Sequence, residues 1–268
     1  MEESPQQEQR VASARPPAII VERLSKRFGK LVAVNDITFM VPQGEFFGFL
    51  GPNGAGKSTT IRVMCGLLQA NYQRILVAGH DLHTDPLGVK ASIGVMLEEP
   101  MLYERLSARE HLRYTGELYG LSRAEADRRG AELLKLLELA DEADRLIVDY
   151  SHGMRKKVNL ACALVHEPPV LFLDEPFAGI DTVTARQIKD LLRQRAAAGA
   201  TIMFSSHVME VVERMCTSLA IIHQGRIVFS DTMANLRARP DYASLEDVFI
   251  RAVGREELIH ADDESWMA

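Results

Sequence analysis

Residues 46–59 read FFGFLGPNGAGKST, and this stretch decides the fold. Phe46–Leu50 is a nearly continuous apolar run, typical of a strand that is covered on both faces. The next eight residues, 51–58, match the pattern GxxxxGK[ST] and Thr59 follows; this is a glycine-rich loop leading from a strand into a helix, here expected from Lys57 to about Leu68. Backbone N–H groups of such a loop curl around phosphate oxygens, which requires conformations closed to residues with a Cβ. The stretch therefore predicts a site for a nucleoside triphosphate.

The loop and the helix after it supply different kinds of contact. The first N–H groups of the helix point at the same anion as the loop. Lys57 can reach the outer phosphates, and the Ser58 hydroxyl is a suitable ligand for Mg²⁺. The residues expected to bind the nucleotide are Gly51, Pro52, Asn53, Gly54, Ala55, Gly56, Lys57, Ser58 and Thr59.

A second buried strand ends in two carboxylates. Asp174 and Glu175 directly follow the apolar run Val170–Leu173, and ligands of α/β proteins bind at the carboxyl ends of parallel strands. We expect Asp174 to hold the Mg²⁺ shell, directly or through water. Glu175 points differently and could orient or deprotonate an attacking water. The alternative is that the two acids simply end a strand at the solvent.

Length and composition exclude several classes of protein. The chain has 268 residues, 47% of them hydrophobic and 25% charged, which fits one large α/β domain or two small ones. Its formal net charge of -6 argues against nucleic acid as the principal partner. No run approaches the ~20 apolar residues of a membrane-spanning helix. Cys65, Cys162 and Cys216 are far apart in the sequence and are expected to be buried thiols in a reducing compartment.

The remaining sequence alternates between β-rich and helical stretches. Residues 1–17 are polar, lack the apolar segment of a signal peptide, and predict a mobile tail. A helical insert is expected over about 103–165, where Ser107/Glu110 and Ser122/Glu125 have capping-box spacing and a leucine stripe over 133–139 follows. Further strands are expected at 18–21, 37–41 and 201–204, and as a hairpin at 219–222 and 226–229.

From residue 18 to about 254 the chain resembles the ATP-binding-cassette (ABC) ATPases. The segment 150–157, YSHGMRKK, resembles that family's LSGGQ signature and lies where the family has it, just before the second acidic strand. It departs from LSGGQ at Tyr150, His152 and Met154, and the resulting YS-x-GM-R pattern is similar to that of ATPase subunits of ABC-2-type exporters. The resemblance implies that Ser151, His152 and Gly153 face the ATP held by the opposite protomer. Ser151 is also expected to be a helix N-cap, and His152 either contacts phosphate or is solvated.

The resemblance implies roles for four further residues. Phe28 corresponds to the aromatic residue that stacks on adenine, and Asp181 lies in the loop that reports across the dimer interface. His207 corresponds to the switch histidine near the γ-phosphate. Glu98 falls where most members have a Gln that links Mg²⁺ and water to the membrane partner, and Glu99 is the alternative if the register shifts by one. The added negative charge of Glu98 either strengthens Mg²⁺ coordination or is displaced until the partner engages.

The fold implied by the resemblance is α/β, a P-loop NTPase core with a RecA-like, mostly parallel sheet. It includes an N-terminal antiparallel β subdomain and an inserted α-helical subdomain at about 103–165. We expect the ATPase domain over residues 18–254, a disordered tail over 1–17 and an acidic C-terminal tail over 255–268.

Three functions are compatible with these features. The first is the cytosolic, ATP-hydrolysing motor of an ABC-2-type exporter, held at the inner face of the cell membrane by a separate transmembrane permease. The second is a soluble ABC ATPase with a non-transport role, and the third is a P-loop switch protein. The signature variant and the segment 244–250, which resembles a short helix of exporter subunits, favour the first. The signature-like helix and His207 argue against the third. The resemblance implies ATP and Mg²⁺ as ligands. It also implies that two ATPase subunits form a homodimer or a heterodimer, and we expect no nucleic acid partner.

Overall fold

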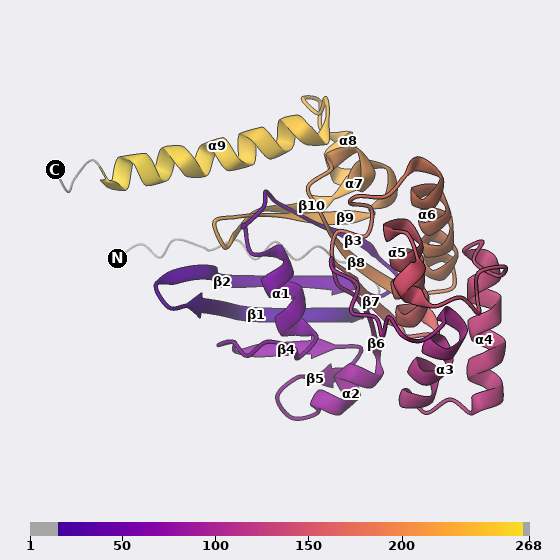
Figure 1. Cartoon of the computed structure of the whole chain (residues 1–268). Helices are drawn as coiled ribbons and strands as arrows, with labels where there is room; N and C mark the ends of the chain where they lie inside the picture. Colours follow the sequence, from indigo (N-terminus) through magenta and orange to yellow (C-terminus); the bar gives the residue numbers. More distant parts are fainter. Residues whose placement is uncertain (1–15, 265–268) are drawn as a thin grey trace.

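Strand β3 (Phe46–Leu50), which precedes the glycine-rich loop, pairs in parallel with β8 and β9 inside a six-stranded sheet of order β10-β9-β3-β8-β7-β6. A second, antiparallel sheet has the order β2-β1-β4-β5. The computed structural model describes residues 16–264 (Figure 1). Most of the expected N-terminal tail lies outside these residues, and β1 begins at Pro17. The expected α/β class with an antiparallel β subdomain and an inserted helical subdomain is confirmed.

The other strands are β1 (Pro17–Phe28), β2 (Leu31–Pro42), β4 (Arg74–Val77), β5 (His80–Asp81), β6 (Ile93–Met96), β7 (Val170–Leu173), β8 (Thr201–Ser206), β9 (Ser218–His223) and β10 (Arg226–Thr232). The helices are α1 (Lys57–Met64), α2 (Pro86–Ala91), α3 (Ala108–Leu118), α4 (Arg123–Leu136), α5 (His152–Leu164), α6 (Thr182–Ala197), α7 (Met209–Met215), α8 (Met233–Ala238) and α9 (Leu245–Glu264), with a 3₁₀ turn η1 (Ile147–Asp149).

Alternate residues of β3 enter two separate hydrophobic cores. Phe46 and Leu50 pack with apolar residues of α5, α6 and α7 on one face of the six-stranded sheet. Phe47 and Phe49 pack with α1 and the antiparallel sheet on the other face, where Phe39 of β2 stacks on Phe49 with ring centroids 5.6 Å apart. The strand is therefore covered on both faces, as its apolar run predicts.

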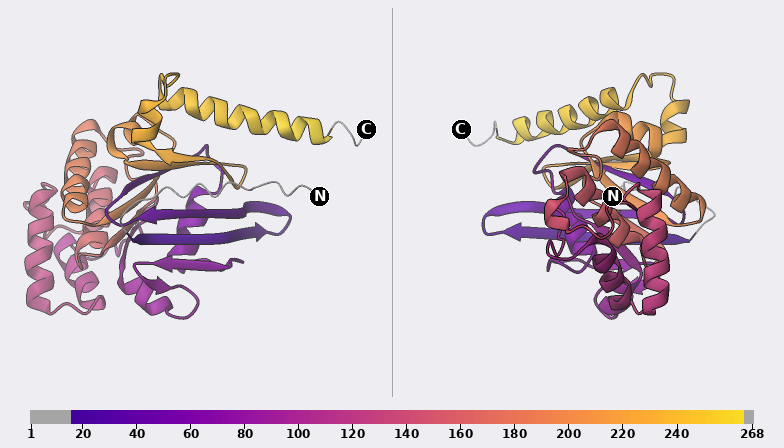
Figure 2. Two further views of the ribbon diagram at one scale, coloured as in Figure 1. Left: turned by 180° about the vertical axis from the view of Figure 1, so that it is seen from behind. Right: turned by 45° about the vertical axis from the view of Figure 1, so that its right-hand side comes forward.

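Helices α3 and α4 of the insert and the tip of the β1–β2 hairpin lie at opposite ends of the molecule (Figure 1 and Figure 2). Both views in Figure 2 place α3 and α4 away from the tip of the β1–β2 hairpin. In Figure 1 and in the left view of Figure 2, α9 extends from the six-stranded sheet toward the side of that tip. It runs as one helix from Leu245 to Glu264, across the boundary expected at residue 254.

Several elements differ in detail from the sequence prediction. Helix α1 ends at Met64 rather than near residue 68, because Gly66 adopts a left-handed φ of 66° and Leu67 N–H donates back to the Arg62 carbonyl. Ser107 and Glu110 form the expected reciprocal capping box. At the start of α4 the Ser122 hydroxyl accepts from Glu125 N–H, but the Glu125 carboxylate instead binds arginines of its own helix.

The three cysteines are free thiols, and the predicted burial holds for Cys65 and Cys216 but only in part for Cys162. Cys65 and Cys216 are buried and Cys162 is half-buried. Burial raises the pKa of all three thiols, that of Cys162 to about 12. The side chains of Cys216 and Val212 leave room only for glycine at position 48. A Cβ at Gly48 would lie 2.9 Å from Cys216 Sγ and 2.6 Å from Val212 Cγ1. The protonated, enclosed thiols indicate packing roles.

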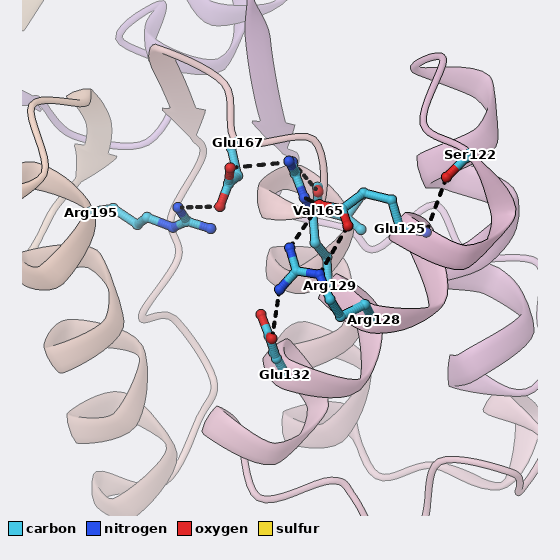
Figure 3. Close-up of polar contacts among 8 residues, drawn as sticks. All are labelled: Ser122, Glu125, Arg128, Arg129, Glu132, Val165, Glu167 and Arg195. Atoms are coloured by element: carbon cyan, nitrogen blue, oxygen red, sulfur yellow. Dashed lines mark hydrogen bonds and ion pairs between the residues drawn. The ribbon is translucent and has the colours of Figure 1, made fainter.

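An ion-pair network ties the helical insert to the six-stranded sheet (Figure 3). Arg129 of α4 binds Glu125 one turn earlier, with Nε and Oε1 2.6 Å apart, and reaches Glu167 just before β7 at 3.3 Å. Glu167 also lies 3.3 Å from Arg195 of α6. Hydrogen bonds from Arg128 and Arg129 lower the pKa of Glu125 to about 2. Arg129 is therefore the residue of this network that joins α4 to β7 and α6.

Replacing Arg129 by Met should destabilise the fold more than the same change at Arg128. The Arg129 side chain is 20% exposed and reaches across elements, whereas that of Arg128 is 54% exposed and pairs only within α4. We expect Arg129→Met to lower the free energy of unfolding by about 1–2 kcal/mol, and Arg128→Met by about 0.5 kcal/mol or less. Urea denaturation of the two variants measures both values, and equal losses would contradict a tie between the subdomains.

Candidate functional site

The glycine-rich loop lies against the backbones of both sheets. A Cβ at Gly51 would lie 2.4 Å from the Ile222 carbonyl oxygen of β9, and one at Gly56 would lie 2.5 Å from that of Ala33 in β2. Gly56 is also the N-cap of α1 and adopts a φ of 111°, which favours glycine. Both glycines are therefore required by close packing and, at Gly56, by backbone conformation.

Lys57, the first residue of α1, is buried and turns back over the loop. Its Nζ donates to the carbonyl oxygens of Gly51 at 2.8 Å and Pro52 at 3.2 Å. The same Nζ lies 3.5 Å from Glu175 Oε1. The ammonium group is thus held at the mouth of the loop, where the outer phosphates of a bound nucleotide were predicted to lie.

The two acids after β7 occupy different environments. Asp174 is fully buried; its Oδ1 accepts from the Ser205 hydroxyl at 2.6 Å, and its Oδ2 has no hydrogen-bond partner among the described residues. Glu175 has a left-handed φ of 48°, which is uncommon for a residue other than glycine. Its Oε1 lies 3.0 Å from His207 Nδ1 as well as near Lys57. Glu175, His207 and Lys57 therefore converge, and the alternative of a simple strand end at the solvent does not fit.

A cavity of about 450 Å³ collects most of the predicted nucleotide residues. The β1–β2 hairpin contributes Phe28, Leu31 and Ala33, and Phe28 is 47% exposed with Lys26 Nζ 4.9 Å from its ring centroid. The opposing residues are Asn53, Gly54, Gly56, Lys57, Ser58, Thr59, Glu98, Glu175 and His207. Glu98 lines the cavity and Glu99 does not, which favours the first register.

The residues near the loop suit a magnesium ion that is held mainly by phosphate and water. Ser58, Glu98 and Asp174 offer hard oxygen ligands, and the unpartnered Oδ2 of Asp174 is an orphaned buried acceptor. Within residues 16–264, no group of three or more His, Cys, Asp or Glu side chains is arranged to hold a metal by itself. Mg²⁺ commonly takes one or two protein carboxylates and completes its shell with phosphates and water.

The signature-like residues form a second surface outside this cavity. Ser151 caps α5 by accepting from Met154 N–H, and His152 is exposed. A Cβ at Gly153 would lie 3.7 Å from Asp181 Oδ2. Hydrogen bonds from Thr184 and Val183 lower the pKa of Asp181 and fix it as the N-cap of α6. The structure thus separates these four residues from the phosphate loop of the same chain.

Sequence reasoning missed two residues that contact the acidic strand end. Ser205 of β8 binds both Asp174, through its hydroxyl, and Glu175, whose N–H donates to it at 2.9 Å. Lys156 of α5 donates to the Glu175 carbonyl oxygen at 3.2 Å. The two serines that follow the strand predicted at 201–204 are a sequence signal for the first of these contacts. Lys156 lies within the signature-like segment 150–157, but nothing in that pattern predicts its contact with Glu175.

The described part of the chain holds no helix long and apolar enough to cross a bilayer.

A family model described as "ABC transporter" matches residues 34–178. The chain is 38% identical to the linearmycin resistance ATP-binding protein LnrL of Bacillus subtilis, over 81% of this chain and 70% of that one. It is 37% identical to the ABC transporter ATP-binding protein NatA of the same organism, over 83% and 91%. A solved ATP-binding subunit of an ABC transporter superposes with a TM-score of 0.82 and 34% identity, over 88% of this chain and 99% of that one.

Replacing Lys57 by Ala should weaken ATP binding roughly 10–100-fold, because the phosphates lose charge-assisted hydrogen bonds from the buried ammonium. Equilibrium titration with a fluorescent ATP analogue measures the loss. Lys135→Ala, an exposed lysine of α4, serves as the charge-matched control and should bind like the parent. Unchanged affinity in Lys57→Ala would remove the phosphate-binding role from the loop.

Proposed function

The chain belongs to the ABC transporter family, and we propose that it is the ATP-hydrolysing motor subunit of an ABC-2-type exporter. A separate transmembrane permease would hold it at the inner face of the cell membrane and would determine the transported substrate. The observation that carries the hydrolytic role is the convergence of Lys57 Nζ and His207 Nδ1 on Glu175 Oε1, at 3.5 Å and 3.0 Å, beside a cavity that also holds Phe28.

The chemistry follows from these positions. The loop N–H groups and Lys57 bind the β- and γ-phosphates, and Phe28 stacks on the base. Glu175 orients a water for attack on the γ-phosphorus and accepts its proton, giving ADP and phosphate. His207 holds the Glu175 carboxylate and faces the γ-phosphate. Ser58, Asp174 and Glu98 would hold magnesium, which when bound would neutralise part of the phosphate charge.

We place the second nucleotide contact in another ATPase subunit. Ser151, His152 and Gly153 lie outside their own chain's cavity, so they are free to face the ATP of a second copy or of a related subunit. Asp181, next to Gly153, would report on that contact. ATP would then bind the closed pair better than the open one, which is the differential affinity that a conformational motor needs.

An apolar hollow beside the Glu98 loop is the proposed permease contact. Its cavity of about 240 Å³ lies between that loop, α3 and α5, and Met101, Leu67 and Tyr119 at its rim are exposed. Exposed apolar residues gathered around a hollow are typical of protein interfaces. The resistance function in the name of LnrL is in line with export. Co-purification from native membranes separates this function from the alternative, a soluble ABC ATPase: a captured protein with several apolar spans supports export.

Glu175→Gln separates hydrolysis from binding. The amide keeps the size of the side chain but removes its basicity, so the rate of ATP hydrolysis should fall by ~10²–10⁴-fold. ATP binding should be retained or tightened, because one negative charge beside the triphosphate is gone. Phosphate release, measured with the permease present, tests the rate, and size-exclusion chromatography with ATP and Mg²⁺ tests whether the closed dimer accumulates.

The control for this change is Glu210→Gln, which alters an exposed glutamate in the first turn of α7, close in sequence to His207. It should hydrolyse ATP at the parent rate. Hydrolysis at the parent rate by Glu175→Gln itself would show that the carboxylate is not the base.

A further inference from the structure

Lys156 is a buried cation to which the proposed chemistry gives no role. It lies in the second turn of α5 and is 1% exposed. A buried ammonium is costly unless its donors are paired. Its Nζ donates to the carbonyl oxygens of Glu175, at 3.2 Å, and of Ala178. Both acceptors belong to the single loop that connects β7 to α6, so the lysine spans from one element to another rather than serving its own helix.

The loop that Lys156 holds begins at a strained residue. Glu175 has a φ of 48°, a conformation that residues with a Cβ rarely adopt and that persists only where the surroundings enforce it. Its N–H donates to Ser205 Oγ at 2.9 Å, and its carbonyl oxygen accepts from Lys156. The two peptide groups on either side of the Glu175 Cα are therefore each fixed by a side chain from another element.

We propose that Lys156 is a positioning residue for ATP hydrolysis, which fixes the backbone of Glu175 so that its carboxylate points between Lys57 and His207. The direction of a Cα–Cβ bond is determined by the two flanking peptide groups. Without the bond to its carbonyl, Glu175 could relax toward a negative φ and swing its carboxylate away from Lys57 Nζ. The inference rests on the proposed role of Glu175 as the base.

The charges around Lys156 agree with this placement. Burial lowers the pKa of Lys156, and the carboxylates of Glu98, Glu175 and Asp174 act in the opposite direction. The ammonium thus lies among the acids of the site, yet its hydrogen bonds go to main-chain oxygens. What it supplies is a fixed pair of donors, which a neutral amide can supply in part.

Steady-state ATPase kinetics of Lys156→Met and Lys156→Gln test the proposal. We expect Met to lower kcat at least tenfold and leave the KM for ATP within twofold, because the nucleotide contacts are untouched. Gln, whose amide can donate to one of the carbonyls, should recover kcat to within about fivefold of the parent. Lys157→Met is the matched control: Lys157 is the next residue of α5, is also buried, and makes no hydrogen bond to the 175–181 loop among the described residues. It should keep the parent kcat.

A double-mutant cycle decides whether Lys156 acts through Glu175. In the Glu175→Gln background, single-turnover hydrolysis should fall by no more than about twofold when Lys156→Met is added. Additive losses overturn the proposal, as do a parent-like kcat in Lys156→Met and a Gln variant as inactive as Met. If Lys156→Met fails to fold, the comparison of Lys156→Gln with the parent and with its own Glu175→Gln double variant gives the same test. A parent rate in Glu175→Gln alone would instead refute the proposed function.

Discussion

The phosphate loop packs closely against the backbone of both sheets, and the site depends on these contacts. Gly51 lies under the Ile222 carbonyl of one sheet and Gly56 under the Ala33 carbonyl of the other. The Ala55 carbonyl oxygen accepts a hydrogen bond from the N–H of Gly225 in the β9–β10 turn. The carbonyl oxygen of Gly225 in turn accepts one from the N–H of Asn35 in β2. The loop is therefore fastened to both sheets at once. Any side chain at either glycine would separate the sheets and displace the loop that must surround the phosphates.

The features that the sequence predicted well have local causes. The apolar run of β3, the glycine-rich loop and the capping boxes each depend on residues a few positions apart, and the turn at Gln224-Gly225 has two positive φ values as such a hairpin requires. The end of α1 was predicted too late because the apolar residues after Met64 continue the helical pattern, while Gly66 ends it. Lys156 could not be found, since the carbonyls that it binds lie 19 and 22 residues further along the chain.

Helix α5 connects the two halves of the proposed reaction. Its N-terminus carries Ser151 to Gly153, which are proposed to face the nucleotide of a second subunit, and one turn later Lys156 holds the loop that begins at Glu175. If the two ATPase subunits close and displace α5 as a rigid body, Lys156 would therefore move the backbone of Glu175 in its own chain. The network of Arg129, Glu167 and Arg195 joins α4 to the strand that ends in this acid, so the helical insert and the catalytic loop are mechanically connected at two places.

The hairpin side of the nucleotide cavity has a consequence for the choice of nucleotide. Phe28, Leu31 and Ala33 offer an aromatic face and apolar contact, and a ring face stacks on any flat base without reading the hydrogen-bonding groups at its edge. The phosphates, by contrast, would be bound by the backbone N–H groups of the glycine-rich loop. If Phe28 stacks on the base as proposed, such a site would select for the triphosphate more strongly than for the identity of the base.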